Sequence, residues 1–92
     1  MTIPELHTRL QGLGFLSEEY YLHGLYGSTN DNDKLSMTIK KGKYTIEYEV
    51  YFRERGEKHS SKTFTSEHDA CEHFLKQLLE TRTLQQALKN RG

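Results

Sequence analysis

The stretch from Lys43 to Gly56 constrains the fold of this chain more than any other. Its residues alternate between an apolar or aromatic set and a largely polar set: Tyr44, Ile46, Tyr48, Val50 and Phe52 against Thr45, Glu47, Glu49, Tyr51 and Arg53. A period of two is typical of a β-strand that has one face on a core and the other in water. The pattern therefore predicts a central strand with one buried face.

Three further segments predict strands. Leu35, Met37 and Ile39 alternate with polar residues, and Lys41-Gly42 makes a tight connection from there to the central strand, which predicts a hairpin. The aromatic-rich segment 20–26 predicts a first strand. The polar segment 59–65 predicts a fourth.

Helical patterns flank these strands. Thr2 and Glu5 match a capping box at the start of a short amphipathic helix. Ser66 is placed to cap a second helix with a broad apolar stripe. Thr83-Leu84-Gln85-Gln86 resembles another capping box, which predicts a helix break near residues 81–83. The order α-β-β-β-β-α predicts a two-layer α+β fold, with a four-stranded antiparallel sheet and N- and C-terminal helices packed on it.

Length and composition limit the possible classes of protein. The 92 residues predict a single domain, residues 1–92, with a modest core. The sequence has no apolar run long enough to span a membrane, so we expect no membrane partner. A single cysteine excludes an internal disulfide framework and suits a reducing compartment. We therefore expect a cytoplasmic protein.

The formal net charge of zero hides a separation of charge along the chain. Residues 1–33 contain one basic and five acidic residues, a net charge of −4. Residues 34–66 contain eight basic and four acidic residues, a net charge of +4. Such a separation can steer a charged partner towards one side of a fold, and it also arises from ordinary variation of a surface.

The sequence contains no motif for catalysis, cofactor binding or metal binding. We therefore expect a protein that is not an enzyme and that binds neither a cofactor nor a metal. His68 and His73 are five residues apart, about 140° around a helix, and do not share a ligand face. Cys71 falls in the apolar stripe, where it acts as a small hydrophobe. A calcium loop that begins at Asp31 would need a glycine and a glutamate where this chain has Ser36 and Gly42.

Nucleic-acid binding is the alternative function. The element order resembles that of the double-stranded-RNA-binding domain, over about residues 3–80. Such domains carry a lysine-rich cluster at the start of the second helix, where this chain has Ser66-Glu67-His68-Asp69. The net charge of zero is a second argument against a nucleic-acid partner, because such proteins are usually basic. A small RNA-binding module remains the second hypothesis.

Three segments carry a resemblance to a known family. They are Leu13-Gly14 followed by Tyr20-Tyr21-Leu22, then Glu49-Val50-Tyr51-Phe52-Arg53-Glu54-Arg55-Gly56, and then Phe64-Thr65-Ser66-Glu67 leading into Asp69-Ala70-Cys71-Glu72-His73-Phe74-Leu75. The chain resembles the small immunity proteins of bacterial polymorphic-toxin systems, including contact-dependent growth inhibition. Similar immunity proteins often have a tryptophan on the central strand, and this chain has none.

The resemblance implies a stoichiometric inhibitor and not an enzyme. Such proteins stay in the cytoplasm and block a cognate C-terminal toxin domain, often a nuclease, by covering its active site or substrate surface. No motif fixes their contact residues, so the candidates come from the polar strand face and the acidic loop before it. An acidic surface that meets a basic nuclease cleft follows the usual electrostatic logic. The toxin-binding candidates are Asp31, Asp33, Glu47, Glu49, Tyr51 and Arg53.

Overall fold

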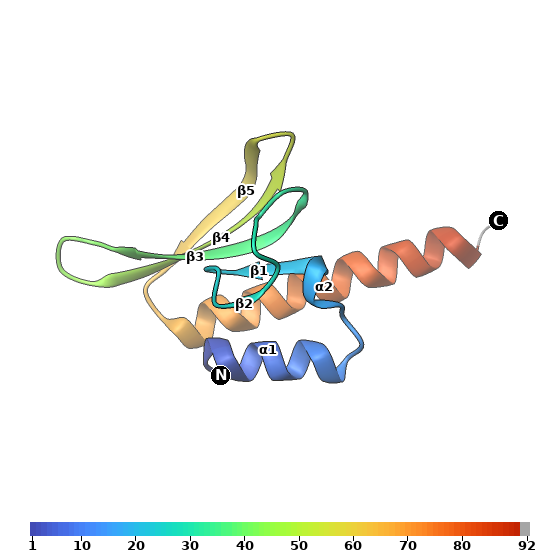
Figure 1. Cartoon of the computed structure of the whole chain (residues 1–92), viewed down its shortest axis with the longest axis horizontal. Helices are drawn as coiled ribbons and strands as arrows, with labels where there is room; N and C mark the ends of the chain where they lie inside the picture. Colours follow the sequence, from blue (N-terminus) through green and yellow to red (C-terminus); the bar gives the residue numbers. More distant parts are fainter. Residues whose placement is uncertain (91–92) are drawn as a thin grey trace.

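The computed structural model describes the backbone of residues 1–90 and the side chains of residues 1–83. The chain runs through α1 (Ile3–Gly12), η1 (Ser17–Glu19), β1 (Tyr20–Leu22), β2 (Tyr26–Gly27), β3 (Lys34–Lys41), β4 (Ile46–Glu54), β5 (Glu57–Phe64) and α2 (Glu67–Asn90). Both helices lie on the same side of one sheet (Figure 1). The predicted α+β class with N- and C-terminal helices is confirmed.

The helix starts follow the sequence, but the predicted helix break is wrong. In α1 the Thr2 hydroxyl accepts from the Glu5 N–H, and the Glu5 carboxylate accepts from the Thr2 N–H at 3.0 Å. Ser66 Oγ accepts from the N–H of Asp69 at 3.3 Å. Helix α2 continues through residues 81–83 to Asn90. The Thr83 hydroxyl donates to the Leu79 carbonyl at 2.9 Å, a bond within the helix, and so caps no new one.

The sheet has five strands in the order β2-β1-β3-β4-β5, with β1 parallel to β3 and the other neighbours antiparallel. The prediction of four antiparallel strands is wrong in this detail. The segment predicted as one strand, 20–26, turns at His23 and Gly24, whose φ values are 52° and 73°. The chain reverses there and again between β2 and β3, and two reversals make β3 parallel to β1.

One core fills the space between the helices and the sheet. Its members come from both helices, from β1, β3 and β4, and from the segment between α1 and η1: Ile3, Leu6, Leu10, Phe15, Tyr20, Leu22, Met37, Val50, Ala70, Cys71, Phe74, Leu75 and Leu78. Burial raises the pKa of the Cys71 thiol to about 11, in keeping with its predicted place in the apolar stripe. Within the described part of the chain, no helix combines the length and the apolar character needed to cross a bilayer.

The two faces of β4 are not simply buried and exposed. On the helix-facing side only Val50 is fully buried, while Ile46 and Phe52 are 51% and 36% exposed. On the opposite side, predicted to face water, Glu49 and Tyr51 are only 7% and 2% exposed. The predicted burial of the apolar side therefore holds at the middle of the strand, whereas the predicted exposure of the opposite side is wrong there. Beyond the helices the apolar side loses its cover, and other polar side chains cover the opposite side.

Candidate functional site

The candidate site lies on the sheet face that carries no helix. Met37 and Val50 belong to the core, so strand alternation places Ser36, Glu49 and Tyr51 on the other face. The segment between β2 and β3 lies over this face and contributes Asp31. Seven side chains are joined there by hydrogen bonds, ion pairs and one cation–π contact, and we call them the strand-face network: Asp31, Lys40, Glu49, Tyr51, Arg53, Lys58 and Ser61.

One half of the strand-face network is centred on Asp31. The Tyr51 hydroxyl donates to Asp31 Oδ2 at 2.7 Å, and the Arg53 guanidinium donates to the same oxygen at 3.1 Å. The hydrogen bond from Tyr51, followed by that from Arg53, lowers the pKa of Asp31. Burial, and then the hydrogen bond to Asp31 and its charge, raises the pKa of Tyr51. The Asp31 carboxylate and the neutral Tyr51 phenol therefore stabilise each other's protonation state.

The other half is centred on Glu49. Its carboxylate accepts from Ser61 Oγ at 2.6 Å and pairs with Lys58 Nζ at 2.9 Å and Lys40 Nζ at 3.0 Å. The hydrogen bond from Ser61, helped by the two ammonium groups, lowers the pKa of Glu49 to about 2. Lys58 Nζ also lies 4.6 Å from the centre of the Tyr51 ring, which links the two halves. Glu49 stays ionised at any physiological pH.

The structure brings four of the six predicted residues together and leaves two at the margins. Asp31, Glu49, Tyr51 and Arg53 belong to the strand-face network. Glu47 is half-buried near the start of β4, opposite Lys40 in the strand register. Asp33 is exposed beside the other end of β4, where its carboxylate accepts from the Arg55 N–H at 3.3 Å.

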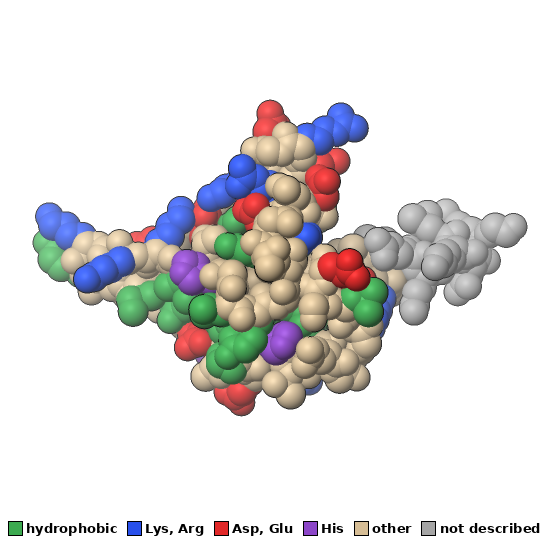
Figure 2. Space-filling model, viewed as in Figure 1, with side chains coloured by type: hydrophobic (Ala, Val, Ile, Leu, Met, Phe, Trp, Pro, Cys, Tyr) green, Lys and Arg blue, Asp and Glu red, His purple; other side chains and the backbone are tan. Residues whose placement is uncertain are grey.

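The cations of the strand-face network were not among the sequence candidates. Lys40, Arg53 and Lys58 outnumber the carboxylates of Asp31 and Glu49, so the network is of mixed charge and not acidic. Figure 2 shows lysine and arginine side chains interspersed with acidic ones along the strands. Lys40 and Lys58 lie opposite Glu47 and Arg53 in the two hairpins, so hairpin pairing could have placed them on this face.

Ser61 could not have been found in this way. It reaches Glu49 because β4 and β5 slip in register between Val50 and Phe52, where Ser60 adopts a φ of 53°. A bulge of this kind inserts an extra residue on one strand and re-aims the side chains beside it. No signal in the sequence of β5 marks its position.

A groove of about 690 Å³ lies on the opposite side, between α2 and strands β3 to β5. Its lining combines apolar side chains such as Leu35 and Phe52 with charged ones such as Glu18 and Arg82. His73 also lines it, and burial, followed by the charges of Lys62 and Lys76, lowers the pKa of this imidazole. Among the described side chains, no hydrogen bond or ion pair joins His73 to a carboxylate, and no group of ligands suited to a metal is found.

The segments that resemble immunity proteins divide between the core and the strand-face network. Tyr20, Leu22 and Phe74 are fully buried, whereas Glu49, Tyr51 and Arg53 belong to the network. No family model, no curated protein and no solved structure matches the chain.

Proposed function

We propose that this protein is an immunity protein that binds a cognate bacterial toxin domain, a nuclease, and neutralises it by steric and electrostatic blocking. The observation that carries the proposal is the strand-face network. It presents charged groups in fixed positions on a sheet face that neither helix covers. A stoichiometric inhibitor needs such a surface, whereas an enzyme would need convergent reactive groups beside a substrate pocket.

Fixed side chains favour binding because ordering them costs little further entropy. Immobilising a flexible side chain at an interface costs about 0.5–1.5 kcal/mol. Glu49 is already held by three donors and Asp31 by two. The partly exposed cations Lys40, Arg53 and Lys58 would then meet the toxin in positions that the carboxylates have fixed.

The mixed charge of the network favours specificity over general attraction to basic proteins. Alternating charges match one complementary pattern and penalise partners that place like charges opposite them. Blocking would thus depend on a matched toxin, as the resemblance to immunity proteins implies. Because the pKa of Glu49 is about 2, this pattern would not change across physiological pH.

Co-expression with the toxin encoded by the adjacent upstream reading frame tests the proposal. The wild-type protein should restore growth, and the purified pair should elute as one complex from a sizing column. Glu47→Lys should weaken binding about tenfold or more, because it reverses a charge at the margin of the network without breaking a described hydrogen bond. Glu72→Lys, on the exposed side of α2, is the matched control and should bind as the wild type does.

The alternative, an RNA-binding module, has weaker support. At the start of α2, where a double-stranded-RNA-binding domain places lysines, Glu67 instead accepts a hydrogen bond from the Ile3 N–H at 2.8 Å. A mobility shift of duplex RNA that weakens steeply with salt would favour this alternative. Failure of the wild-type protein both to restore growth and to form a complex with the toxin would reject the immunity proposal.

A further inference from the structure

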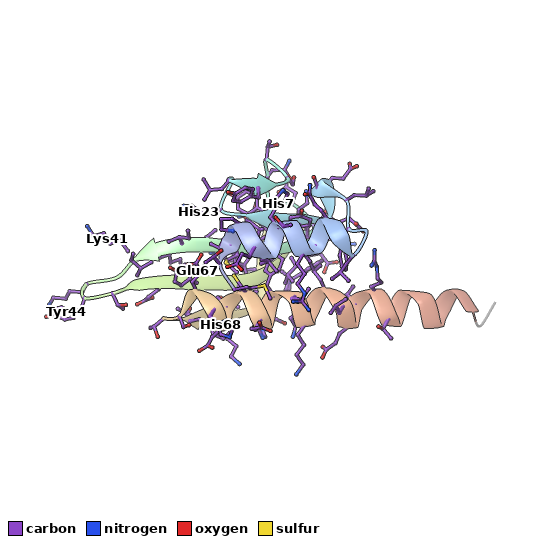
Figure 3. The ribbon with its side chains drawn as sticks, turned by 90° about the horizontal axis from the view of Figure 1, so that it is seen from below. His7, His23, Lys41, Tyr44, Glu67 and His68 are labelled. Carbon is purple, nitrogen blue, oxygen red and sulfur yellow. The ribbon has the colours of Figure 1, made fainter. Side chains whose placement is uncertain are left out.

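The tip of the β3–β4 hairpin projects beyond the rest of the fold. Strands β3 and β4 pair as far as Lys41 opposite Ile46, and the N–H of Gly42 donates to the Thr45 carbonyl at 2.7 Å. In Figure 1 the tip lies at one end of the long axis, and in Figure 3 Lys41 and Tyr44 lie past the N-terminal ends of both helices. We call residues 41–46 the finger.

The finger exposes the apolar side chains that a folded protein usually buries. Tyr44 is 89% exposed and Ile46 is 51% exposed, although Ile46 belongs to the helix-facing set of β4. Lys41 and Lys43 lie beside them, and neither has an ion-pair partner among the described side chains. Tyrosine is enriched at the centre of protein interfaces, and charged side chains such as those of lysine lie mostly at the polar rim.

The finger is also pre-shaped. A Cβ on Gly42 would lie 2.9 Å from both the Thr45 carbonyl oxygen and Glu47 Oε1, so the turn leaves no room for a side chain there. At its base Lys40 pairs with Glu49 at 3.0 Å, which joins the finger to the strand-face network. The turn and the base thus constrain the backbone from which Tyr44 and the two lysines project.

We propose that the finger inserts into an apolar pocket of the toxin that carries carboxylates at its mouth. This inference rests on the proposed function and names the chemistry of the partner's surface. Tyr44 and Ile46 would fill the apolar pocket, and Lys41 and Lys43 would pair with the carboxylates. A nuclease active site that binds metal ions through acidic side chains would supply such carboxylates. The finger would thus block the catalytic centre while the strand-face network contacts the surrounding surface.

The charge of the finger favours a protein over a nucleic acid. Specific binding to a duplex neutralises several phosphates, about 6–10 in strong cases. The finger offers two unpaired lysines, and Lys40 is already paired with Glu49. Two cations are few for a duplex backbone, and they are enough to pair with carboxylates at the mouth of a small pocket.

The test measures binding of finger variants to the purified toxin domain from the adjacent upstream reading frame. Tyr44→Ala should weaken the affinity about 30-fold, the effect of removing an interface hot spot. Lys41→Glu with Lys43→Glu should slow association and invert its dependence on salt. Leu25→Ala, which removes a 63% exposed leucine outside the finger, is the control and should bind within about twofold of the wild type. Unchanged melting of each variant establishes that folding is intact.

The outcomes separate this inference from the proposed function. If the wild type binds and all finger variants bind equally well, the finger does not insert and the immunity proposal stands. If the wild type does not bind, both are rejected. If instead the wild type retards a duplex RNA of about 20 base pairs in a mobility-shift assay and the double lysine variant does not, the finger binds a nucleic acid. If Tyr44→Ala converts a dimer into a monomer on a sizing column, the finger's partner is a second copy of this chain.

Discussion

The Tyr51 hydroxyl donates to Asp31 Oδ2 at 2.7 Å and thereby joins the loop before β3 to the middle of β4, 20 residues further along the chain. Tyr51 is 2% exposed, although it lies on the sheet face without a helix. Its ring lies beneath the Lys58 ammonium, and its hydroxyl reaches the loop. The hydrogen bond therefore holds the loop against one end of the strand-face network. Its removal should lower the stability of the folded protein.

Tyr51→Phe should lower the free energy of unfolding by about 1.5 kcal/mol, because Asp31 loses a hydrogen bond to its charged form. The ring, and its contact with Lys58, would remain. Urea denaturation followed by circular dichroism measures the change. Tyr44→Phe removes the same hydroxyl from an 89% exposed tyrosine and should leave the midpoint unchanged. Equal midpoints for Tyr51→Phe and the wild type would show that this bond adds nothing to stability.

Acid should destabilise the protein through Glu49. Its pKa in the folded chain, about 2, is below the ordinary value of 4.5, so its contribution is complete above pH 4.5 and is lost as the pH falls from there to about 2. The loss should be on the order of 2 kcal/mol after allowance for solvent screening. Asp31, whose pKa is also lowered, adds to the loss in the same direction.

Denaturation at about pH 6 and about pH 2.5 tests this pH dependence. Glu49→Gln should be less stable than the wild type at the higher pH and should lose less on acidification. Glu72→Gln, a change at an exposed position on α2, should keep the full pH dependence. An identical acid loss in the wild type and in Glu49→Gln would assign the effect to other carboxylates.

Gly27 should not tolerate a side chain. Its φ is +77°, and a Cβ would lie 2.5 Å from the Tyr20 carbonyl oxygen, where β2 turns back along β1. Gly27→Ala should therefore cost at least about 2 kcal/mol. Gly12→Ala is the matched control, because Gly12 ends α1 and a Cβ there would meet nothing within 4 Å. The melting temperature of Gly27→Ala should fall, whereas that of Gly12→Ala should stay the same or rise.

Cys71 should be unreactive towards thiol reagents in the folded protein. It is fully buried, and burial raises the pKa of its thiol to about 11, so the reactive thiolate is scarce and inaccessible. Labelling with a chromogenic disulfide should proceed only in denaturant, or at the rate of unfolding. Phe74→Ala, which removes a fully buried ring next to this region, should cost about 4 kcal/mol and speed the labelling. Rapid labelling of the native wild type would contradict the burial.

Local signals predicted the elements of this fold well. The capping residues Thr2 and Ser66 begin their helices where the sequence places them, and the predicted hairpin of β3 and β4 forms. Its loop, residues 42–45, is longer than the tight connection predicted at Lys41-Gly42. These features depend on neighbours within a few residues. The parallel pairing of β1 with β3 does not, because it depends on the turn at His23 and Gly24, and the aromatic segment around them looks continuous in sequence.

Part of the candidate site was predictable because strand alternation is also a local signal. Alternation in β4 placed Glu49, Tyr51 and Arg53 on one face, and the structure joins Tyr51 and Arg53 to Asp31. Alternation does not say how deeply a face is covered. The burial of Tyr51 comes from a loop and from β5, which approach from distant parts of the chain.

The irregular pairing of β5 bears on how the protein behaves at high concentration. This strand forms an open edge of the sheet, and such edges are templates for pairing with other chains. The φ of 53° at Ser60 and the slipped register beside it interrupt the regular row of unpaired backbone groups, and Lys58 and Lys62 place charge on either side. The distortion that brings Ser61 to Glu49 thus also protects the chain against edge-to-edge aggregation.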